Sequence, residues 1–505
     1  MKFSIIPKPL KITDLGTQKI VIAKNSKIEA INNFLSDELK KALSGLSTAE
    51  GAAAVKFERT GEPLGEEGYR ITADGAVKIQ ANGDNGLFYG LQTLIQLIKC
   101  NIADGAAVFS NFEIVDKPRF AYRGYMLDIC RHFFCKDSII RQIDAIALLK
   151  LNKLHLHLSE DQGFRIESEA FSGLNEIGSY RRETVGDGEK HGGYLTKADI
   201  KEIVAYAKKR GIDVVPEIDI PGHTTAMLAA FPELSCRGES LEVATKFGIK
   251  PDILCAGNEK VYEFVKTLIG EIAGLFPYEY FHIGGDEAPK IRWENCPKCR
   301  EMLARQKLNN FEELQGYFTN VVIEHLKSLG KTAIVWNESV NSGILDKSAV
   351  VQYWKNGSFS KEKVAAEAKS GRSVIVSKFT PYYLDYPYGM TPLKNVYLFE
   401  PAMDFAEGAV IGVESPLWTE YVADDKKIDY MTYPRLTAVA ETAWSEKGKK
   451  DYAGFKTRLV DFYALLAEKG IAAAPLSETD PPKLKGLISV VKFFKNTLKS
   501  ISPVK

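Results

Sequence analysis

Two adjacent carboxylates, Asp286 and Glu287, follow an apolar segment and two glycines in the sequence FHIGGDEAPK. The apolar residues predict a buried strand, and Gly284 and Gly285 allow the chain to turn tightly or to approach a ligand closely. Pro289 prevents the strand from continuing in a hydrogen-bonded ladder. The carboxylates are therefore expected just past a strand end, where α/β proteins place acid–base chemistry. An isolated Asp-Glu pair is more often solvated surface, so the surrounding residues decide between the two interpretations.

The segments that must position this pair alternate between strand-like and helix-like patterns from about Pro118 onwards. Eight strands alternating with helices predict a (β/α)8 TIM barrel with enlarged loops, an α/β fold. An open doubly wound sheet is the alternative, but no glycine-rich phosphate loop follows the first strand. The predicted strands are Gly124–Ile129, Lys153–Leu158, Asp213–Ile218, Tyr278–Ile283, Thr332–Trp336, Val350–Trp354, Ser373–Ser377 and Ala409–Val413. The predicted helices include Ser138–Lys150 (with Asp137 as its N-cap), Lys197–Arg210, Lys260–Leu275, Glu312–Leu329 and Lys361–Lys369.

We divide the chain into three parts. Residues 1–117 are predicted to form a small α+β domain, in which GYRITAD and AVKIQA have the alternation of strands and GLFYGLQTLIQLIK has the spacing of a covering helix. Residues 118–470 are assigned to the catalytic barrel, and residues 471–505 to a C-terminal tail with a helix. That tail is basic and has an apolar stripe, so it either packs on its own domain or contacts a membrane surface or a partner.

The composition narrows the function classes. With 505 residues, 45% of them hydrophobic, the chain can build a large core, and a net charge of +1 gives no basic field for nucleic acid. No apolar run is as long as a membrane span, and the N-terminus lacks the apolar core of a secretion signal. Two compartments stay open: the cytoplasm, or the periplasm or exterior if a signal peptide was removed.

Each predicted strand delivers polar or aromatic residues at its carboxyl end, which is the end that carries the chemistry in such barrels. Five of the seven histidines belong to this set, so the ionisable groups converge on one rim. In strand order the set is Asp128, Arg131 and His132; His155, His157, Glu160 and Asp161; Glu217, Asp219 and His223; His282, Asp286 and Glu287; Trp336 and Glu338; Gln352 and Trp354; Tyr382, Tyr383 and Asp385; Glu414, Trp418 and Glu420.

Aromatic residues in this set indicate a sugar as the ligand. Four of the five tryptophans, Trp293, Trp336, Trp354 and Trp418, lie in barrel loops or at late strand ends. Flat apolar rings pack on the C–H faces of a sugar, while charged groups hydrogen-bond its hydroxyls. The planar donor fork of Arg131 suits two adjacent hydroxyls.

A metal site is the competing chemistry. His155 and His157 share one face of a strand, as in metal-dependent hydrolases, but after His282 only His325 remains, inside a predicted helix. We therefore expect no metal and no cofactor, and expect the paired histidines to brace carboxylates. The single CxxC, Cys296 and Cys299, is interpreted as a thiol pair rather than a zinc site, because no second pair lies nearby in the sequence.

The residues now described resemble a known family, the β-N-acetylhexosaminidases of glycoside hydrolase family 20. The segments that carry the resemblance lie in the order typical of the family, and FHIGGDEAP is the most diagnostic. Two residues depart slightly from the family pattern: Leu156 stands where the family often has tryptophan, and Glu160 stands where the acidic residue of the family varies. The N-terminal stretch is similar to the small α+β domain of that family. The matching segments are PRFAYRGYMLDICRHF, NKLHLHLSEDQGFRIE, VVPEIDIPGHT, FHIGGDEAP, WNE, QYW, YYLDY and LWTE.

The resemblance implies a mechanism in which the 2-acetamido group of the substrate, not an enzyme carboxylate, attacks the anomeric carbon and forms an oxazolinium ion. It implies that Glu287 is the general acid and base, and that Asp286 orients the acetamido N–H and stabilises developing charge. Tyr383 is implied to hold the acetamido oxygen. The other implied residues are the walls Trp336, Trp354 and Trp418, the contacts to outer hydroxyls Arg131, Asp385 and Glu420, and the supporting residues Asp161, His223 and His282.

An exo-acting β-N-acetylhexosaminidase that releases terminal β-linked GlcNAc or GalNAc is therefore the expected function, with a glycan as the partner. A lacto-N-biosidase or a chitooligosaccharide-specific relative is a close alternative, and a looser pocket near Asp385 and Glu420 would distinguish it. A non-catalytic glycan-binding protein and a metal-dependent hydrolase are the alternatives from other classes.

Overall fold

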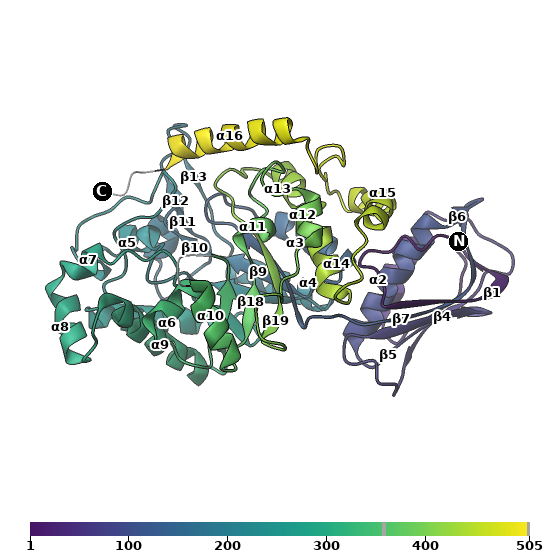
Figure 1. Ribbon diagram of the computed structural model, residues 1–505, viewed down its shortest axis with the longest axis horizontal. Helices are drawn as coiled ribbons and strands as arrows, with labels where there is room; N and C mark the ends of the chain where they lie inside the picture. The colour runs from purple at the N-terminus through teal and green to yellow at the C-terminus, as the bar shows by residue number, and fades with distance from the viewer. Residues whose placement is uncertain (356–359, 502–505) are drawn as a thin grey trace.

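The computed structural model describes residues 1–355 and 360–501. Figure 1 shows a β-sheet domain at the N-terminal end of an elongated molecule and a larger barrel domain beside it, with helix α16 across the top of the barrel. Among the described residues no helix has the length and apolar character needed to cross a bilayer.

Eight parallel strands close into a barrel in the order β14-β15-β16-β17-β18-β19-β8-β9, so the prediction of a TIM barrel is confirmed. The strands form because their apolar residues are buried on both faces, as parallel barrels require. Their predicted positions are confirmed, with ends that differ by a few residues. The strands are β8 Tyr122–Asp128, β9 Lys153–His157, β14 Asp213–Glu217, β15 Tyr280–His282, β16 Thr332–Trp336, β17 Val350–Tyr353, β18 Val374–Val376 and β19 Val410–Leu417.

Helices join most of these strands and surround the barrel. The predicted N-cap of the first was wrong: α3 starts at Lys136 with Cys135 in the cap position, so Asp137 lies in the first turn, where its charge favours the helix dipole. A 3-10 helix, Asn337–Ser342, joins β16 to β17. The α-helices are α3 Lys136–Leu148, α4 Lys197–Lys208, α5 Thr225–Ala230, α6 Glu259–Ala273, α7 Ile291–Glu294, α8 Pro297–Arg305, α9 Phe311–Ser328, α10 Ser360–Lys369, α11 Phe379–Tyr382, α12 Leu393–Leu398, α13 Asp425–Thr432, α14 Arg435–Trp444, α15 Tyr452–Glu468 and α16 Lys483–Ser500.

Enlarged loops follow several strands, as predicted. The loop after β9 contains two short hairpins and a π-helical turn, Leu174–Gly178, and the loop after β14 contains a 3-10 turn, Pro232–Leu234. The hairpin strands are β10 Ser159–Glu160, β11 Gly163–Phe164, β12 Tyr180–Arg181 and β13 His191–Gly192.

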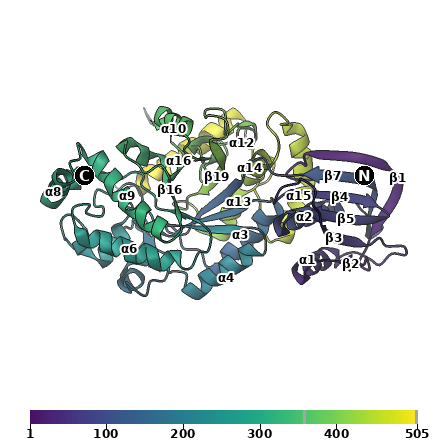
Figure 2. The same ribbon diagram turned by 90° about the horizontal axis from the view of Figure 1, so that it is seen from below.

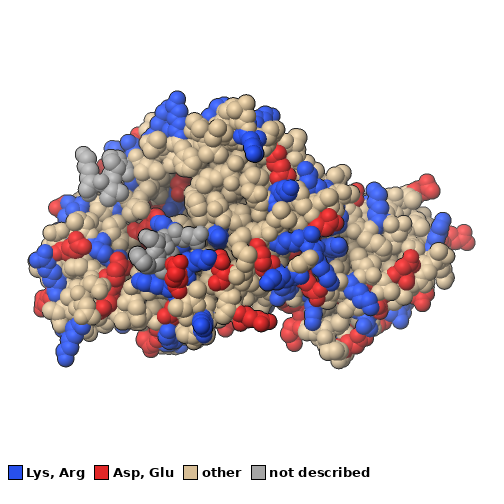
Figure 3. Space-filling model, in the orientation of Figure 1, with Lys and Arg blue, Asp and Glu red and all other residues tan. Residues whose placement is uncertain are grey.

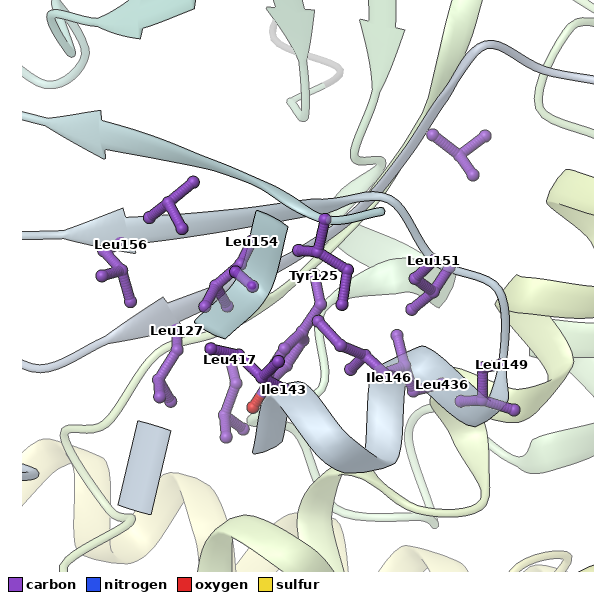
Figure 4. Packing of buried hydrophobic residues seen from close by; sticks show 14 of the residues in the cluster. Tyr125, Leu127, Ile143, Ile146, Leu149, Leu151, Leu154, Leu156, Leu417 and Leu436 are labelled. Carbon is purple, nitrogen blue, oxygen red and sulfur yellow. The ribbon is translucent and has the colours of Figure 1, made fainter. Parts of the chain in front are cut away.

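The layer between the barrel strands and the helices is a continuous apolar core. In Figure 4 the apolar side chains of α3, including Ile143 and Ile146, point toward Leu154 of β9 and Tyr125 of β8. All four of these residues are fully buried. At about 1.5–3 kcal/mol for each buried large apolar side chain, this layer holds the strand ends in fixed positions.

The N-terminal domain is a mixed sheet in the order β1-β7-β4-β5-β3-β2, with β6 paired to β7. One covering helix was predicted, and the structure has two. Helix α2 lies between the sheet and the barrel (Figure 2), which explains why every residue from Gly86 to Ile98 is buried. The elements are β1 Lys11–Ile22, β2 Ile28–Glu29, α1 Asn33–Leu43, β3 Val55–Arg59, β4 Tyr69–Asp74, β5 Ala76–Ala81, α2 Asp84–Cys100, β6 Ile102–Ala103 and β7 Ala106–Asp116.

A buried polar cluster joins the two domains. Lys150, which follows α3, places its ammonium 3.2 Å from Asp116 at the end of β7, and both side chains are fully buried. The Tyr69 hydroxyl and the Trp444 indole also donate hydrogen bonds to Asp116. Burial lowers the pKa of Lys150 to about 8, although Asp116 opposes that shift.

Helix α16 packs on the barrel loops through one side only. Phe493 contacts Tyr386 and Tyr421, whose ring centroids lie 5.4 and 5.3 Å away. Leu484, Leu487 and other large apolar residues of the same helix are exposed.

The face seen in Figure 3 has interspersed basic and acidic side chains and is hollowed below the top of the molecule, where acidic atoms are visible inside the hollow.

Candidate active site

The two glycines after β15 fix the path of the chain into the site. Gly284 has φ +65° and Gly285 has φ +98°, which is the left-handed region that glycine tolerates. A Cβ on Gly284 would lie 1.6 Å from Asp219 Oδ1, so no other residue fits there. The Gly285 N–H donates to the same carboxylate at 3.1 Å. The glycines therefore bring the chain against the end of β14 and place the next two residues over the barrel.

Asp286 is buried, and its Oδ1 has no hydrogen-bond partner among the residues that the structure describes. Its Oδ2 lies 4.0 Å from Nε2 of His223. Burial, against the opposing charge of His223 and with help from the carboxylates of Glu287 and Glu217, raises the pKa of Asp286 to about 6. A buried carboxylate with an unpaired oxygen is a strong acceptor for an N–H that a ligand supplies.

Glu287 is half-buried and lies beside Asp286 with φ +43°, a conformation that is strained for a residue other than glycine. Its Oε1 accepts a hydrogen bond from Lys355 Nζ at 3.4 Å. The side chain is therefore partly open to solvent, as a group that exchanges protons with water must be.

A third carboxyl group lies next to this pair. Glu338, at the end of β16, accepts a hydrogen bond from the Trp354 indole at 2.8 Å. Burial raises the pKa of Glu338 to about 8, and the charge of Asp286 adds to the shift. Asp219 behaves similarly, because burial and Asp286 raise its pKa well above the usual range. The site thus holds more carboxyl groups than it can ionise at once.

Aromatic rings from four strand ends surround the carboxylates. Trp354 and Tyr383 are stacked, with ring centroids 5.8 Å apart and an interplanar angle of 18°. Trp336 lies 6.5 Å from Trp354 and 6.0 Å from Trp418. Tyr383 and Trp418 are 6.2 Å apart, which connects the rings into one wall.

Charged residues lie at the other end of the aromatic wall. The guanidinium of Arg131 is 4.7 Å from the centre of the Trp418 ring, 2.7 Å from Glu160 and 4.0 Å from Glu420. Burial and the nearby Glu420 raise the pKa of Asp385 well above its usual range. In the part of the chain that is described, Asp385 Oδ1 has no hydrogen-bond partner. These groups offer both donors and acceptors to a polar ligand.

A buried network of histidines and carboxylates underlies the site. Glu217, at the end of β14, is 2.5 Å from His157 Nδ1, 3.2 Å from His155 Nε2 and 2.9 Å from His282 Nδ1. It also accepts the Trp336 indole N–H at 2.8 Å. Both imidazoles of the HxH pair therefore lie against the Glu217 carboxylate, as expected for histidines that brace a carboxylate.

Two further supporting residues were predicted, and each has polar partners. His223 Nδ1 is 2.8 Å from Glu160, and although burial opposes it, this carboxylate raises the pKa of His223 well above the usual range. Glu160 therefore favours the imidazolium form of His223, whose Nε2 faces Asp286. Asp161 accepts hydrogen bonds from the backbone N–H and hydroxyl of Thr225, at 2.9 and 2.6 Å, and so holds the start of α5.

Two family models match the chain: "Glycosyl hydrolase family 20, catalytic domain" over residues 120–447 and "Glycosyl hydrolase family 20, domain 2" over residues 2–117. The chain belongs to glycoside hydrolase family 20. It is therefore a glycoside hydrolase, as predicted from the sequence.

Relatives and solved structures agree with this membership. The chain is 36% identical to a β-hexosaminidase of Porphyromonas gingivalis, covering 93% of this chain but only 64% of that protein. It is 32% identical to a β-N-acetylhexosaminidase of Cellulomonas fimi, covering 90% of this chain and 92% of the relative. The structure of a family 20 β-N-acetylhexosaminidase from Streptomyces coelicolor is similar, with a TM-score of 0.82 at 33% identity, covering 94% of this chain and 98% of that one.

Every residue predicted for the family 20 site lies on the carboxyl-end rim of the barrel or in the loops that follow it. Glu338 was in the predicted strand-end set, but its hydrogen bond with Trp354 was not predicted. Lys355 was not predicted at all, and its position directly after Trp354 was the available signal. The sequence does not predict which pairs of these side chains are in contact.

Proposed function

We propose that the protein is an exo-acting β-N-acetylhexosaminidase that releases terminal β-linked GlcNAc or GalNAc from glycans by a retaining, substrate-assisted mechanism. The observation that carries the proposal is Asp286 Oδ1, a buried carboxylate oxygen that has no donor among the described residues and lies next to the partly exposed Glu287 and the aromatic wall. An acetamido N–H is the donor that this oxygen lacks.

The first half of the reaction breaks the glycosidic bond. Asp286 accepts the acetamido N–H and turns the carbonyl oxygen toward the anomeric carbon, while Tyr383 holds that oxygen in place. As the carbonyl oxygen bonds to carbon, Glu287 gives its proton to the leaving oxygen. The positive charge that develops on the oxazolinium ring is stabilised by the anionic Asp286.

The second half returns the enzyme to its starting state. Glu287, now a carboxylate, takes a proton from water, and the water oxygen attacks the anomeric carbon on the face that the leaving group vacated. Attack opens the oxazolinium ring and regenerates the acetamido group, so the sugar leaves with its original anomeric configuration. Lys355 Nζ, 3.4 Å from Glu287 Oε1, holds this side chain in place by a hydrogen bond.

The remaining residues bind one sugar. Trp336, Trp354 and Trp418 pack on its apolar faces and enclose the acetamido methyl group. Arg131, Asp385 and Glu420 hydrogen-bond the outer hydroxyls, and a pocket closed at that end favours single terminal sugars. Asp161, His223 and His282 hold these groups in position.

The test compares an aryl β-N-acetylglucosaminide with the matching β-glucoside. The wild type should cleave only the acetamido sugar. Glu287→Gln should lose at least about a hundredfold in kcat, the usual contribution of a general acid. Glu294→Gln in α7, an exposed residue, is the matched control and should retain full activity. Equal cleavage of both sugars would contradict substrate assistance, and cleavage of neither would favour a glycan-binding protein.

One observation keeps the lacto-N-biosidase alternative testable. A cavity of about 470 Å³ lies under α16 and includes Asp385, Tyr421, Lys485 and Phe493 in its lining. If this cavity admits a second sugar beyond Asp385, an aryl lacto-N-bioside will be cleaved in one step with release of the disaccharide. If the pocket ends at Asp385, that substrate will be stable and only monosaccharide glycosides will be cleaved.

A further inference from the structure

Four of the seven cysteines meet at one point outside the active site. Cys236, Cys255, Cys296 and Cys299 place their sulfur atoms within 4.8 Å of one another, and all but Cys236 are buried. The sulfur–sulfur distances are 3.8 Å for Cys236–Cys299, 3.8 Å for Cys255–Cys296 and 3.6 Å for Cys255–Cys299. The CxxC that seemed isolated in the sequence thus has two partners in space.

These distances fit a tetrahedral metal site. Four sulfurs at about 2.3 Å from one Zn²⁺ lie about 3.8 Å apart along the edges of the tetrahedron. A disulfide would need about 2.05 Å between two sulfurs, far shorter than any of the three pairs. Because all four sulfurs converge, the cluster has the ligand number and the ligand type of a structural zinc site.

The local fold supplies the ligands from three segments. Cys236 follows the Pro232–Leu234 turn, and Cys255 is joined to that turn by a hydrogen bond of 2.9 Å from its backbone N–H to Leu234. Cys296 is the N-cap of α8, with a proline in its first turn, and Cys299 is buried in the same turn. A Cβ on Gly257 would lie 2.2 Å from the backbone of α8, so only glycine permits this close packing.

The charges around the cluster suit four thiolates. One Zn²⁺ with four thiolates has a net charge of about −2, and the N-terminus of α8 offers its positive dipole end to Cys296 and Cys299. Arg237 directly follows Cys236, and both Arg237 and Arg292 form ion pairs with Asp252 at 3.0 Å. These ion pairs connect the two loops that supply the cysteines.

We propose that Cys236, Cys255, Cys296 and Cys299 bind one structural Zn²⁺ ion. On binding, the four thiols give up their protons and form four Zn–S bonds, which leaves no open position for a substrate or water. The ion ties the loop that contains His223 to the segment that follows Asp286 and Glu287. It therefore holds two sides of the active site together without taking part in the chemistry.

Metal analysis of the purified full chain tests this directly. Elemental mass spectrometry should find one zinc per chain, and the double variant Cys255→Ser, Cys299→Ser should contain none. Cys135→Ser is the matched control, since that cysteine is exposed and outside the cluster, and it should keep one zinc. A metal-free wild type, or a double variant that keeps its zinc, would overturn the proposal.

A variant that fails to fold would lose zinc for a trivial reason, so a second measurement uses the folded wild type. An organomercurial titrated into the native protein should release zinc to a colorimetric indicator, one equivalent for about four thiols modified. Replacement of zinc by Co²⁺ should give the intense absorption of a tetrahedral cobalt thiolate. Iron in place of zinc, or disulfides among these cysteines in peptide mass spectra, would refute the assignment.

Discussion

We predict that the charge of His223 sets the pH above which Asp286 is ionised and can accept the acetamido N–H of the substrate. Asp286 must be an anion to accept the acetamido N–H, and its pKa is about 6. Below that pH each unit of acid reduces the anionic fraction about tenfold. The acid limb of kcat/KM, which reports groups of the free enzyme, is therefore expected near pH 6.

Removing the imidazolium should move this limb upward. His223 lies 4.0 Å from Asp286, and two unit charges at that distance interact by about 4 kcal/mol at an effective dielectric constant of 20. At about 1.4 kcal/mol per pKa unit, this is an upper value of about three units. A positive neighbour favours the carboxylate and lowers its pKa, so its loss raises the pKa.

The perturbation is His223→Gln, which keeps a polar side chain and removes the charge. We expect the acid limb of kcat/KM on an aryl β-N-acetylglucosaminide to rise by about one to three units. His325→Gln, in α9 and remote from the site in sequence, is the control and should leave the limb near pH 6. The carboxyl groups of Asp219, Glu338 and Glu287 also face Asp286. The apparent pKa of the acid limb is therefore a property of these coupled groups together and not of Asp286 alone. A limb that stays in place in His223→Gln would refute the electrostatic reasoning.

Three further predictions concern the frame of the site and its substrate. Gly284→Ala should lower both Tm and activity, because its Cβ would overlap a carboxylate, whereas Gly330→Ala, with a similar φ of +72° and open space, should cost only about 1–2 kcal/mol by urea unfolding. Lys150→Met should reduce the free energy of unfolding by about 3–5 kcal/mol, because Asp116 would remain buried without its cation; a smaller loss would mean that the other donors suffice. Arg131→Lys should raise KM about tenfold or more with kcat less affected, since a lysine cannot supply the planar donor fork; an unchanged KM would remove Arg131 from the sugar contacts.

The barrel could be predicted from the sequence because each strand is a short apolar run that ends in polar residues, and the structure keeps all eight. The position of Asp286 and Glu287 just past a strand end could be predicted because Gly284 to Glu287 form one contiguous motif. The N-cap of α3 could not, since Asp137 is a preferred capping residue, yet the helix begins before it with Cys135 in the cap position and no side-chain capping bond. Contacts between separate loops were also beyond the sequence, as for Lys355 with Glu287.

The four clustered cysteines are a second case in which contacts between separate loops could not be predicted from the sequence. Cys296 and Cys299 were visible as a CxxC, but Cys236 and Cys255 are 19 residues apart and match no spacing rule. Only the folding of the loops after β14 and β15 against each other brings the four together. A spacing rule detects ligands that are close in sequence. These four cysteines lie in three separate segments of the sequence, and the barrel fold brings them together.

Helix α2 makes the two domains inseparable in practice. From Gly86 to Ile98 it is buried by the sheet on one side and by the barrel on the other. A barrel expressed without residues 1–117 would expose an apolar strip and leave Lys150 without Asp116. Truncation should therefore yield aggregation instead of a minimal enzyme, and intact chains should melt in one transition. For anyone engineering this scaffold, the N-terminal domain is part of the catalytic unit and not a removable accessory.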